Sequence, residues 1–303
     1  MKIGYPCINY SVPCRGNRTF RLASYSEANI ISTVGRNLGC LTTILNYNAE
    51  HGILFFRITS DLVPFASHPV CVFDWKEYFL PEFTAIGEFI RMHEMRISMH
   101  PDQFVLINAL DPDIVQRSVH ELKYHASVLD MLGLDDSAKI QIHIGGMYKN
   151  RSGSLDRFIE RYHSLPPPVQ RRLVLENDDR NYTVKDCLFA SGQTGIPVLL
   201  DVFHHEVNGA GDPIDEVLSS VERTWKSNDG IPMVDYSSQE PGARSGNHAA
   251  RLDPDHFQMF LEKSRPFDID VMLEIREKER AAIRAREIGR NDERIRVKPT
   301  YNP

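Results

Sequence analysis

Two neighbouring stretches decide the fold: Leu173-Val174-Leu175-Glu176-Asn177-Asp178 and Pro197-Val198-Leu199-Leu200-Asp201-Val202-Phe203-His204-His205. Each is a short apolar run of the kind that forms a strand. Each also ends in carboxylate, amide or imidazole side chains. Strand-like runs of this kind alternate with helix-period stretches along the chain, and this order predicts parallel strands joined by right-handed crossovers.

The same pattern extends in both directions from these two stretches. Strand-like runs cover Lys2–Tyr5, Leu54–Ile58, Arg96–Met99, Ile140–Ile144, Leu173–Leu175, Pro197–Asp201, Ile231–Tyr236 and Ile269–Ile275. Amphipathic helical patterns lie between them, such as Val34, Leu38, Leu41 and Leu45. Eight alternating units predict a closed α/β barrel, the TIM (β/α)8 fold, as a single domain. A glycine-rich dinucleotide fingerprint does not follow the first strand, which counts against an open doubly wound sheet.

The two ends of the chain are expected to differ in character. We predict a barrel domain over residues 1–280 and a charged C-terminal tail over residues 281–303. From Arg276 onward the chain alternates Glu with Arg, which is typical of a solvated helix followed by a frayed, mildly basic end.

Composition narrows the class of protein further. The 303 residues are 42% hydrophobic and 25% charged, which is ordinary for a globular protein. The net charge of −6 excludes a basic field over the whole surface, so nucleic-acid binding would need a local patch. The five cysteines are odd in number and form no Cys-x-x-Cys pair, which argues against a disulfide framework or a cysteine zinc site. We find no signal peptide or membrane span, and we expect a cytoplasmic protein.

The ends of the predicted strands carry the chemistry. In a barrel of this type the active site is built at the C-terminal ends of the strands and in the loops that follow. Nine metal-ligand side chains fall there: His68, His100, His143, Glu176, Asp201, His204, Asp235, His248 and Glu274. Imidazoles mixed with carboxylates suit divalent ions such as Mn²⁺, Zn²⁺ or Co²⁺. Nine ligands exceed the need of one ion, so we expect two or three ions, bridged by Glu176 and Glu274, and a phosphoester hydrolase. His205 is expected to support this set rather than bind metal.

Several motifs resemble those of the UV damage endonuclease family. They are Gly4-Tyr5-Pro6-Cys7-x-Asn9, Phe55–Ser60 with Pro64–Pro69, Ser98–Phe104, His143-x-Gly145-Gly146, Leu175–Asp178 and Asp201-x-x-His204-His205. The resemblance runs from residue 1 to about residue 280. It implies a TIM barrel related to apurinic-site endonucleases and, more distantly, to sugar isomerases. It further implies a hydrolase of DNA repair that nicks duplex DNA immediately 5′ of cyclobutane pyrimidine dimers and 6-4 photoproducts, leaving 3′-hydroxyl and 5′-phosphate.

The resemblance also assigns roles to residues. It implies Mn²⁺ as the usual cofactor. We keep Mg²⁺, Co²⁺ or Zn²⁺ as alternative ions and expect catalytic roles for His100, Glu176 and Glu274. It implies that Gln103 and Phe104 probe the lesion, and that Tyr5 and Asn9 line the pocket for the flipped dinucleotide. One segment departs from the family pattern. Where some members have Lys-x-His on strand 7, with the lysine beside the metals, this chain has Met233-Val234-Asp235; Asp235 can still bind a divalent ion.

The partner expected from the resemblance is damaged double-stranded DNA, approached by a nucleoid-associated monomer. Phosphate contacts are expected from local basic residues despite the acidic total. The candidates are Arg15, Arg18, Arg21, Lys149, Arg151 and Arg244.

Three other functions stay open at this point. The chain could be an apurinic-site endonuclease with little photoproduct activity. It could be a metal-dependent sugar isomerase or epimerase, although Gln103 and Phe104 beside a metal histidine argue against a deep sugar pocket. It could also be a damage-binding protein that lost a metal, and with it catalysis, through the changes on strand 7.

Overall fold

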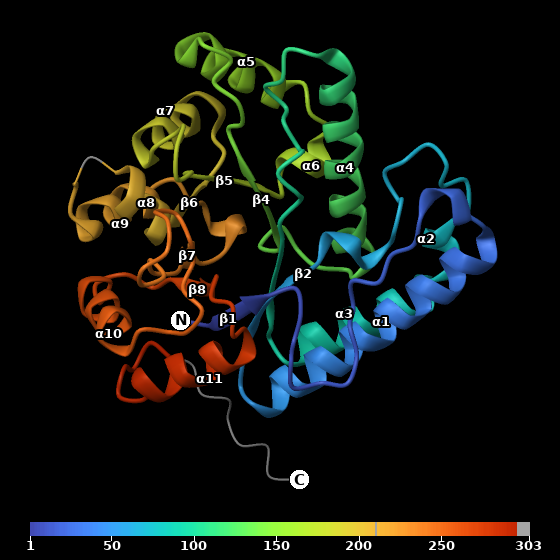
Figure 1. Cartoon of the computed structure of the whole chain (residues 1–303), viewed down its shortest axis with the longest axis horizontal. Helices are drawn as coiled ribbons and strands as arrows, with labels where there is room; N and C mark the ends of the chain where they lie inside the picture. The colour runs from blue at the N-terminus through green and yellow to red at the C-terminus, as the bar shows by residue number, and fades with distance from the viewer. Residues whose placement is uncertain (210, 296–303) are drawn as a thin grey trace.

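Eight parallel strands close into a barrel in chain order, which confirms the predicted single-domain TIM fold (Figure 1). The computed structural model describes residues 1–209 and 211–295. The strands are β1 (Ile3–Pro6), β2 (Phe55–Ile58), β3 (Arg96–Met99), β4 (Lys139–His143), β5 (Leu173–Glu176), β6 (Val198–Asp201), β7 (Met233–Tyr236) and β8 (Asp270–Leu273). Each predicted run overlaps one of them. β1 pairs with both β2 and β8, so the sheet has no free edge.

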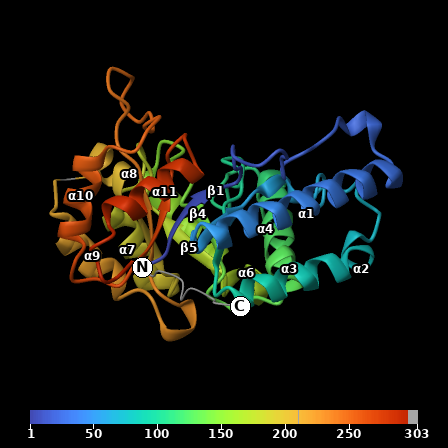
Figure 2. The ribbon, with the colours of Figure 1, turned by 90° about the horizontal axis from the view of Figure 1, so that it is seen from below.

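Helices surround the strands (Figures 1 and 2). They are α1 (Glu27–Glu50), α2 (Trp75–Tyr78), α3 (Leu80–Met92), α4 (Pro112–Met131), α5 (Arg151–His163), α6 (Pro167–Gln170), α7 (Val184–Thr194), α8 (Val202–Asn208), α9 (Ile214–Glu222), α10 (Pro254–Lys263) and α11 (Glu279–Ile288). Short 3-10 helices cover Leu22–Ser24, Ser60–Leu62 and Ser227–Asp229. Helix starts follow local chemistry. Asp111 caps α4 and Asp253 caps α10 through side-chain oxygens, each followed by a proline that already has a helical φ.

Side chains along each strand alternate between the helix layer and the barrel interior. Leu173 and Leu175 of β5 belong to the large core shared with the helices. The intervening strand positions form a separate apolar layer inside the barrel, made of Phe55, Val174, Leu199, Met233 and Met272. Gly4 of β1 fits this interior because a Cβ there would lie 2.2 Å from the backbone oxygen of Phe55. The apolar layer separates the two ends of the barrel.

The C-terminal helix α11 packs against the barrel beside β1 (Figure 1). Its residues Ala281, Ala282 and Ala285 are fully buried, so the expectation of a solvated helix is wrong for this face. The alternating charges pointed to a fully solvated helix, but the small alanines between the long charged side chains are enough to form a face that packs against the barrel. The proposed domain boundary at residue 280 stays a prediction, and residues 296–303 of the expected tail lie outside the described residues.

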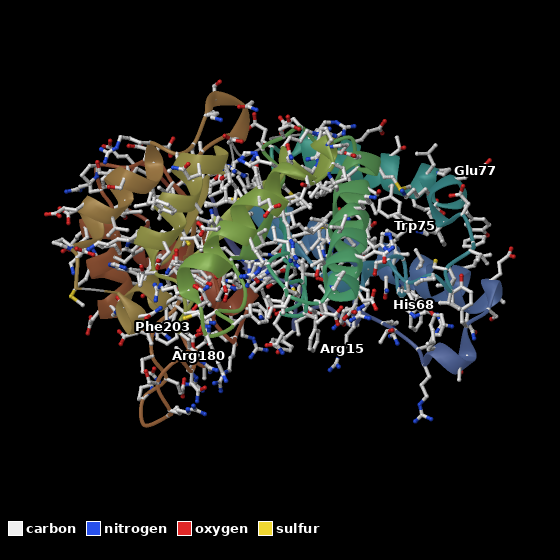
Figure 3. The ribbon with its side chains drawn as sticks, turned by 90° about the horizontal axis from the view of Figure 1, so that it is seen from above. Arg15, His68, Trp75, Glu77, Arg180 and Phe203 are labelled. Atoms are coloured by element: carbon white, nitrogen blue, oxygen red, sulfur yellow. A yellow bond between two sulfur atoms is a disulfide. The ribbon has the colours of Figure 1, made fainter. Side chains whose placement is uncertain are left out.

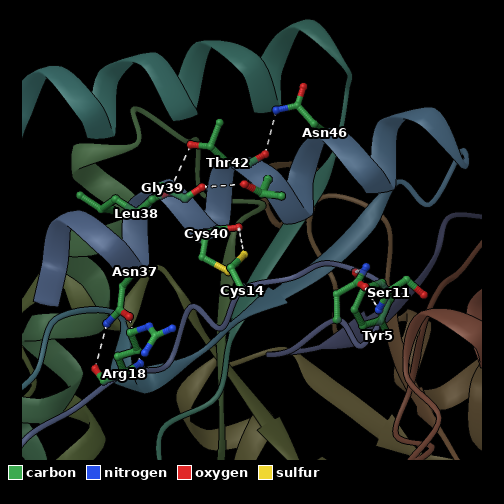
Figure 4. Close-up of a disulfide and its surroundings, with 12 residues drawn as sticks. Tyr5, Ser11, Cys14, Arg18, Asn37, Leu38, Gly39, Cys40, Thr42 and Asn46 are labelled. Carbon is green, nitrogen blue, oxygen red and sulfur yellow. Dashed lines mark hydrogen bonds between the residues drawn. A yellow bond between two sulfur atoms is a disulfide. The ribbon is translucent and has the colours of Figure 1, made fainter.

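A disulfide joins Cys14, in the loop after β1, to Cys40 of α1 (Figure 4). The sequence argued against a disulfide framework and did not foresee this single pair. An odd cysteine count leaves room for a pair that the fold brings together. The loop is also held along α1 by Asn37, whose side chain accepts from the backbone N–H of Arg18 at 2.9 Å and donates to its carbonyl at 3.0 Å. Cys7, Cys71 and Cys187 are free thiols.

None of the helices in residues 1–209 and 211–295 has the length and apolar character that crossing a bilayer demands.

Candidate metal centre

The C-terminal mouth of the barrel gathers carboxylates from four consecutive strands. Glu176 ends β5 and Asp201 ends β6, while Asp235 lies within β7 and Glu274 directly follows β8. Each lies two residues after a member of the apolar layer, so each side chain faces the interior one layer higher. Glu176, Asp201 and Asp235 are at most 1% exposed. Four carboxylates in so little volume need compensating positive charge.

Three overlapping groups of side chains at this mouth have the spacing of metal ligands. The first is His100, His143 and Glu176, the second Glu176, Asp201 and His204, and the third Asp201, Asp235 and Glu274. Glu176 and Asp201 each belong to two groups, so either could bridge two ions. Glu274, which the sequence suggested as a bridge, belongs to one group. The groups form a chain across the barrel mouth rather than one cage.

Three histidines converge on Glu176. Its Oε2 lies 3.3 Å from Nε2 of His100 and 3.7 Å from Nε2 of His143, and its Oε1 lies 3.5 Å from Nδ1 of His204. Burial raises the pKa of Glu176, but these three imidazoles outweigh burial and hold the pKa well below its usual value. Glu176 is therefore a carboxylate, which is the form that binds cations.

Asp201 and His204 form an ion pair, with Nδ1 of His204 lying 3.5 Å from Oδ2 of Asp201. Burial raises the pKa of Asp201 to about 8, with Glu176 and Glu274 adding repulsion and His204 opposing it. Burial lowers the pKa of His204, but Asp201 and Glu176 raise it to about 11. The Asp201 side chain also accepts from the backbone N–H of His204 at 2.7 Å, as the N-cap of α8. The raised pKa values mean that Asp201 and His204 hold their protons more tightly when no metal cation is bound.

An arginine holds the carboxylates of β7 and β8. Arg57 of β2 reaches across the barrel, donating from Nη2 to Oδ2 of Asp235 at 2.6 Å and from Nη1 to Oε1 of Glu274. Burial raises the pKa of Glu274, but Arg57 outweighs it and lowers the pKa to about 2. For Asp235, burial dominates and raises the pKa well above its usual value despite Arg57. Gln141 of β4 donates to both Oε2 of Glu176 at 2.8 Å and Oδ2 of Asp235 at 2.7 Å.

Two carboxylate oxygens of the centre that accept no hydrogen bond within the described part of the chain suit a divalent metal ion. Among the described residues, no hydrogen bond reaches two buried carboxylate oxygens, Oδ2 of Asp201 and Oδ1 of Asp235. Buried polar atoms are normally satisfied, so two orphaned oxygens in one ligand group call for a cation. Imidazole and carboxylate donors are those that borderline divalent ions prefer. The residues present therefore fit a metal centre, and the donor set alone does not choose the ion.

Two of the predicted ligands lie outside these three groups. His68 is exposed in the loop after β2 and lies on the side of Trp75 and Glu77 of α2, across the view from Phe203 of α8 (Figure 3). Its Nδ1 accepts from the backbone N–H of Val70 at 3.0 Å. His248 lies closer: its Nδ1 is 3.8 Å from Oε2 of Glu274, and its ring centroid is 5.8 Å from that of His204. His205, expected to play a supporting role, contacts the carbonyl of Asp212 at 3.0 Å.

The loop that carries the proposed lesion probes borders a cavity beside the metal centre. Gln103 and Phe104 are exposed, and the Phe104 ring is 75% exposed although it is a large apolar side chain. The cavity measures about 380 Å³. It is lined by His100–Gln103, Val105, Leu106, Ile142, His143, Gly145, Gly146, Asp178–Asn181 and His204. An exposed aromatic next to a hollow of this size has room to contact a base.

Tyr5 and Asn9 occupy a more enclosed place than the sequence suggested. Both are buried, at 0% and 4% exposure. The Tyr5 hydroxyl donates to Oδ1 of Asn48 at 2.6 Å and accepts from Nδ2 of Asn9 at 2.8 Å. They therefore bind to each other and to α1, and their proposed contact with a flipped dinucleotide stays a prediction.

The predicted phosphate contacts are exposed, with one difference among them. Arg15, Arg18, Arg21, Lys149, Arg151 and Arg244 all lie at the surface. Arg151 is engaged in an ion pair with Asp186 and lies 5.5 Å above the Tyr182 ring, so it is less free than the others. Arg180 is a further exposed cation that the sequence analysis did not consider, and it lies along the same edge of the molecule as Arg15 in Figure 3.

Two residues of the centre escaped the sequence analysis. Arg57 and Gln141 lie inside strands rather than at their ends. A signal was available, because a buried parallel strand is normally apolar throughout. A charged residue in Phe55-Phe56-Arg57-Ile58 and an amide in Ile140-Gln141-Ile142 both break that rule.

The fold and the mouth together define a class: a (β/α)8 barrel with a histidine–carboxylate centre suited to divalent ions. Comparison with known proteins narrows this class to one family. The chain belongs to the UV-endonuclease UvdE family, whose pattern matches residues 1–297.

Individual relatives agree with this assignment. A UV DNA damage endonuclease of Clostridium perfringens (strain 13 / Type A) is 35% identical over 286 residues, covering 94% of this chain and 69% of the relative. One from Bacillus cereus (strain Q1) is 34% identical over 259 residues, covering 85% and 82%. The crystal structure of SacUVDE is 42% identical with a TM-score of 0.92, covering 96% of this chain and 98% of that one.

More distant structures share the fold alone. Endonuclease IV from Thermus thermophilus is 17% identical, with a TM-score of 0.58 over 83% of this chain and 94% of that one.

Proposed function

We propose that this protein is a metal-dependent endonuclease that nicks duplex DNA immediately 5′ of UV photoproducts, leaving 3′-hydroxyl and 5′-phosphate ends. The substrates would be cyclobutane pyrimidine dimers and 6-4 photoproducts, and the ion Mn²⁺. Family membership supports the class of activity. The observation that carries the metal dependence is the chain of three ligand groups linked through Glu176 and Asp201, with two orphaned oxygens.

Each side chain of the mouth has a part in this reaction. His100, His143, Glu176, Asp201, His204, Asp235 and Glu274 would hold the ions, with His248 in reach. Bound divalent ions supply a nucleophilic water at neutral pH and stabilise the leaving oxygen. Asn177 fixes Asp201, since its side chain accepts from the backbone N–H of Asp201 at 2.9 Å and donates to its carbonyl at 3.0 Å.

Lesion recognition would come from the exposed loop beside the centre. A crosslinked dipyrimidine stacks poorly, so extruding it costs less free energy than extruding sound bases. Phe104 and Gln103 would fill the gap with an apolar wedge and an amide. Because this loop begins at the ligand His100, inserting it would place the neighbouring phosphate near the metal centre.

The experiment is a nicking assay on supercoiled plasmid, irradiated or untreated, with Mn²⁺ or with a chelator. We expect nicking of irradiated plasmid alone, abolished by chelator and restored by Mn²⁺. End-labelled duplexes with one defined lesion would then give the position and the chemistry of the cut. Preferential nicking of depurinated plasmid would identify an apurinic-site endonuclease instead, and nicking that survives exhaustive chelation would overturn the metal requirement.

A further inference from the structure

In the carboxylates on the β7–β8 side of the centre, one oxygen accepts hydrogen bonds from the described residues and the other is left free of them. Oδ2 of Asp235 accepts two hydrogen bonds, from Arg57 Nη2 at 2.6 Å and from Gln141 Nε2 at 2.7 Å. Oδ1 of the same carboxylate is buried and accepts none from residues 1–209 and 211–295. One oxygen of Asp235 is therefore fully used inside the protein, and the other is left over.

The two carboxylate oxygens of Glu274 also differ in their contacts. Its Oε1 accepts from Nη1 of Arg57, while its Oε2 lies 3.8 Å from Nδ1 of His248. The His248 Nδ1 is closer to the backbone oxygen of Glu274, at 3.1 Å, so it does not saturate Oε2. A single guanidinium thus holds one oxygen of each of two carboxylates that come from neighbouring strands.

We propose that Arg57 is a positioning residue that assigns the oxygens of Asp235 and Glu274, holding one of each and leaving the other for a metal ion. This inference rests on the proposed function, because it concerns one position of the same centre. The position would be formed by Asp201, Asp235 and Glu274, whose ligand atoms lie within 4.8 Å of one another. It differs from the two neighbouring groups in having oxygen donors alone.

Oxygen-only donors have a consequence for the ions. Carboxylate sites suit hard ions such as Mg²⁺ and Mn²⁺, whereas sites with imidazole also suit Zn²⁺ and Co²⁺. A guanidinium next to the site further reduces its attraction for a cation. The β7–β8 position should therefore be the weakest of the centre, and the one whose affinity depends on how well Arg57 holds its ligands.

The planar fork of arginine matters here more than its charge. A guanidinium donates in two fixed directions and can grip two carboxylates at once, whereas an ammonium is a compact point charge. The substitution Arg57→Lys keeps the positive charge and removes the fork. It therefore separates positioning from charge balance, which a neutral substitution would not.

The test is a Mn²⁺ titration of the whole protein, followed by the electron paramagnetic resonance signal of free Mn²⁺. In Arg57→Lys we expect the weakest class of bound Mn²⁺ to lose affinity by about tenfold to a hundredfold, the usual scale for losing a supporting partner of a metal ligand. The tighter class, which contains histidines, should be unchanged. Equal affinities in wild type and variant would overturn the inference, as would tighter binding in the variant.

Arg96→Lys is the matched control. Arg96 is also a buried strand arginine paired with an aspartate, since its Nη1 lies 3.2 Å from Oδ2 of Asp270, but this pair lies at the opposite end of the barrel. It should bind Mn²⁺ as the wild type does, even if its melting temperature falls. If both variants lost Mn²⁺ affinity equally, the effect would come from general loosening of the barrel and the inference would be wrong.

Gln141→Leu covers the case in which Arg57→Lys fails to fold. It removes the other donor to Oδ2 of Asp235 and leaves Arg57 in place. It also removes a donor to Oε2 of Glu176, so only a loss confined to the weakest class of Mn²⁺ would come from Asp235. We expect about a tenfold loss in the weakest class, and unchanged binding would overturn the inference. A wild type that binds no Mn²⁺ is a different result, because it would overturn the proposed metal dependence itself.

Discussion

The mouth and the floor of the barrel bury charge in opposite ways. At the floor, the N-terminal end of the strands, three buried cations of the described residues each have an acidic partner. Arg96 pairs with Asp270 at 3.2 Å, Lys139 with Asp229 at 2.6 Å and Arg172 with Asp130 at 2.7 Å. At the mouth, four carboxylates face one arginine and several histidines, and two buried carboxylate oxygens accept no hydrogen bond from the residues that the structure describes.

Buried charged side chains occur at both ends, so burial by itself does not distinguish them. Paired charges satisfy each other and need nothing from solution, which is the pattern of a structural element. A surplus of one sign with orphaned atoms is stable only when something else binds. The difference teaches that the balance of charge, rather than the presence of charge, separates the functional end of this barrel from the structural end.

The largest effect on nicking is expected at Glu176, which is shared by two ligand groups. Glu176→Gln should lower the nicking rate by about a hundredfold to a thousandfold, the scale for removing one electrostatic stabiliser, because a neutral amide bridges two cations poorly. The measurement is the rate on irradiated plasmid at saturating Mn²⁺, with the melting temperature as the control for folding. Full activity in this variant would show that the surplus of carboxylates at the mouth does not mark the functional end of the barrel.

A smaller loss is expected at Asp235, at the edge of the centre. Asp235→Ala should lose one metal equivalent by elemental analysis and about tenfold to a hundredfold in nicking rate. The physical reason is that its free Oδ1 belongs to the oxygen-only group. Unchanged metal content would mean that Asp235 is an ordinary buried partner of Arg57, like Asp270 for Arg96 at the floor.

The loop at the mouth should affect recognition but leave metal binding unaltered. Replacing Gln103 and Phe104 together by alanine should spare metal content and thermal stability, since both side chains are exposed. Stacking on a base is worth about 1–3 kcal/mol, and about 1.4 kcal/mol corresponds to a factor of ten. Binding to photoproduct duplex should therefore weaken by roughly tenfold to a hundredfold.

The measurement is a pair of affinities, on damaged and undamaged duplexes of one sequence at one salt concentration. Binding to undamaged duplex rests on phosphate contacts and should change little. If the ratio of the two affinities stays the same in the double variant, these residues do not probe the lesion.

The smallest effect on nicking is expected from the floor. Lys139→Met leaves Asp229 buried without its partner and should lower the free energy of unfolding by about 3–5 kcal/mol. Nicking per folded molecule should stay at the wild-type rate, because the apolar layer separates this pair from the metal centre. Urea unfolding and the nicking rate at low temperature measure the two quantities. A loss of nicking beyond the unfolded fraction would show that the two ends are coupled.

The sequence predicted the fold and the broad location of the site for a clear reason. Parallel strands bring their C-terminal ends to one side of the barrel, so residues such as His143, Glu176 and Asp201 had to lie near one another. The fold class and the family are confirmed. The roles of individual site residues stay predictions.

Other features depend on contacts that no local pattern encodes. Arg57 grips Asp235 and Glu274 across the barrel, which follows from strand register over a separation of 178 and 217 residues. Met233 stands at the position where some members of the family carry a lysine beside the metals. In this structure it lies one layer below the carboxylates, among apolar side chains. His68 has a ligand side chain and follows a strand, but in the structure it belongs to none of the three groups, and its role as a ligand stays a prediction.

The hydrogen bonds between Glu279 and the loop after β1 affect how this chain folds during synthesis. Its carboxylate accepts from the backbone N–H of Tyr10 and the hydroxyl of Ser11, and β1 pairs with β8 nearby. At about 5–20 residues per second, the 269 positions between Tyr10 and Glu279 take roughly 13 to 54 s to emerge from the ribosome. During that time β1 has one unpaired edge, and the segment carrying Asn9 lacks its anchor. A nascent chain stalled before β8 should therefore expose a strand edge with unpaired backbone N–H and C=O groups. We expect chaperones to bind that truncated form rather than the finished barrel.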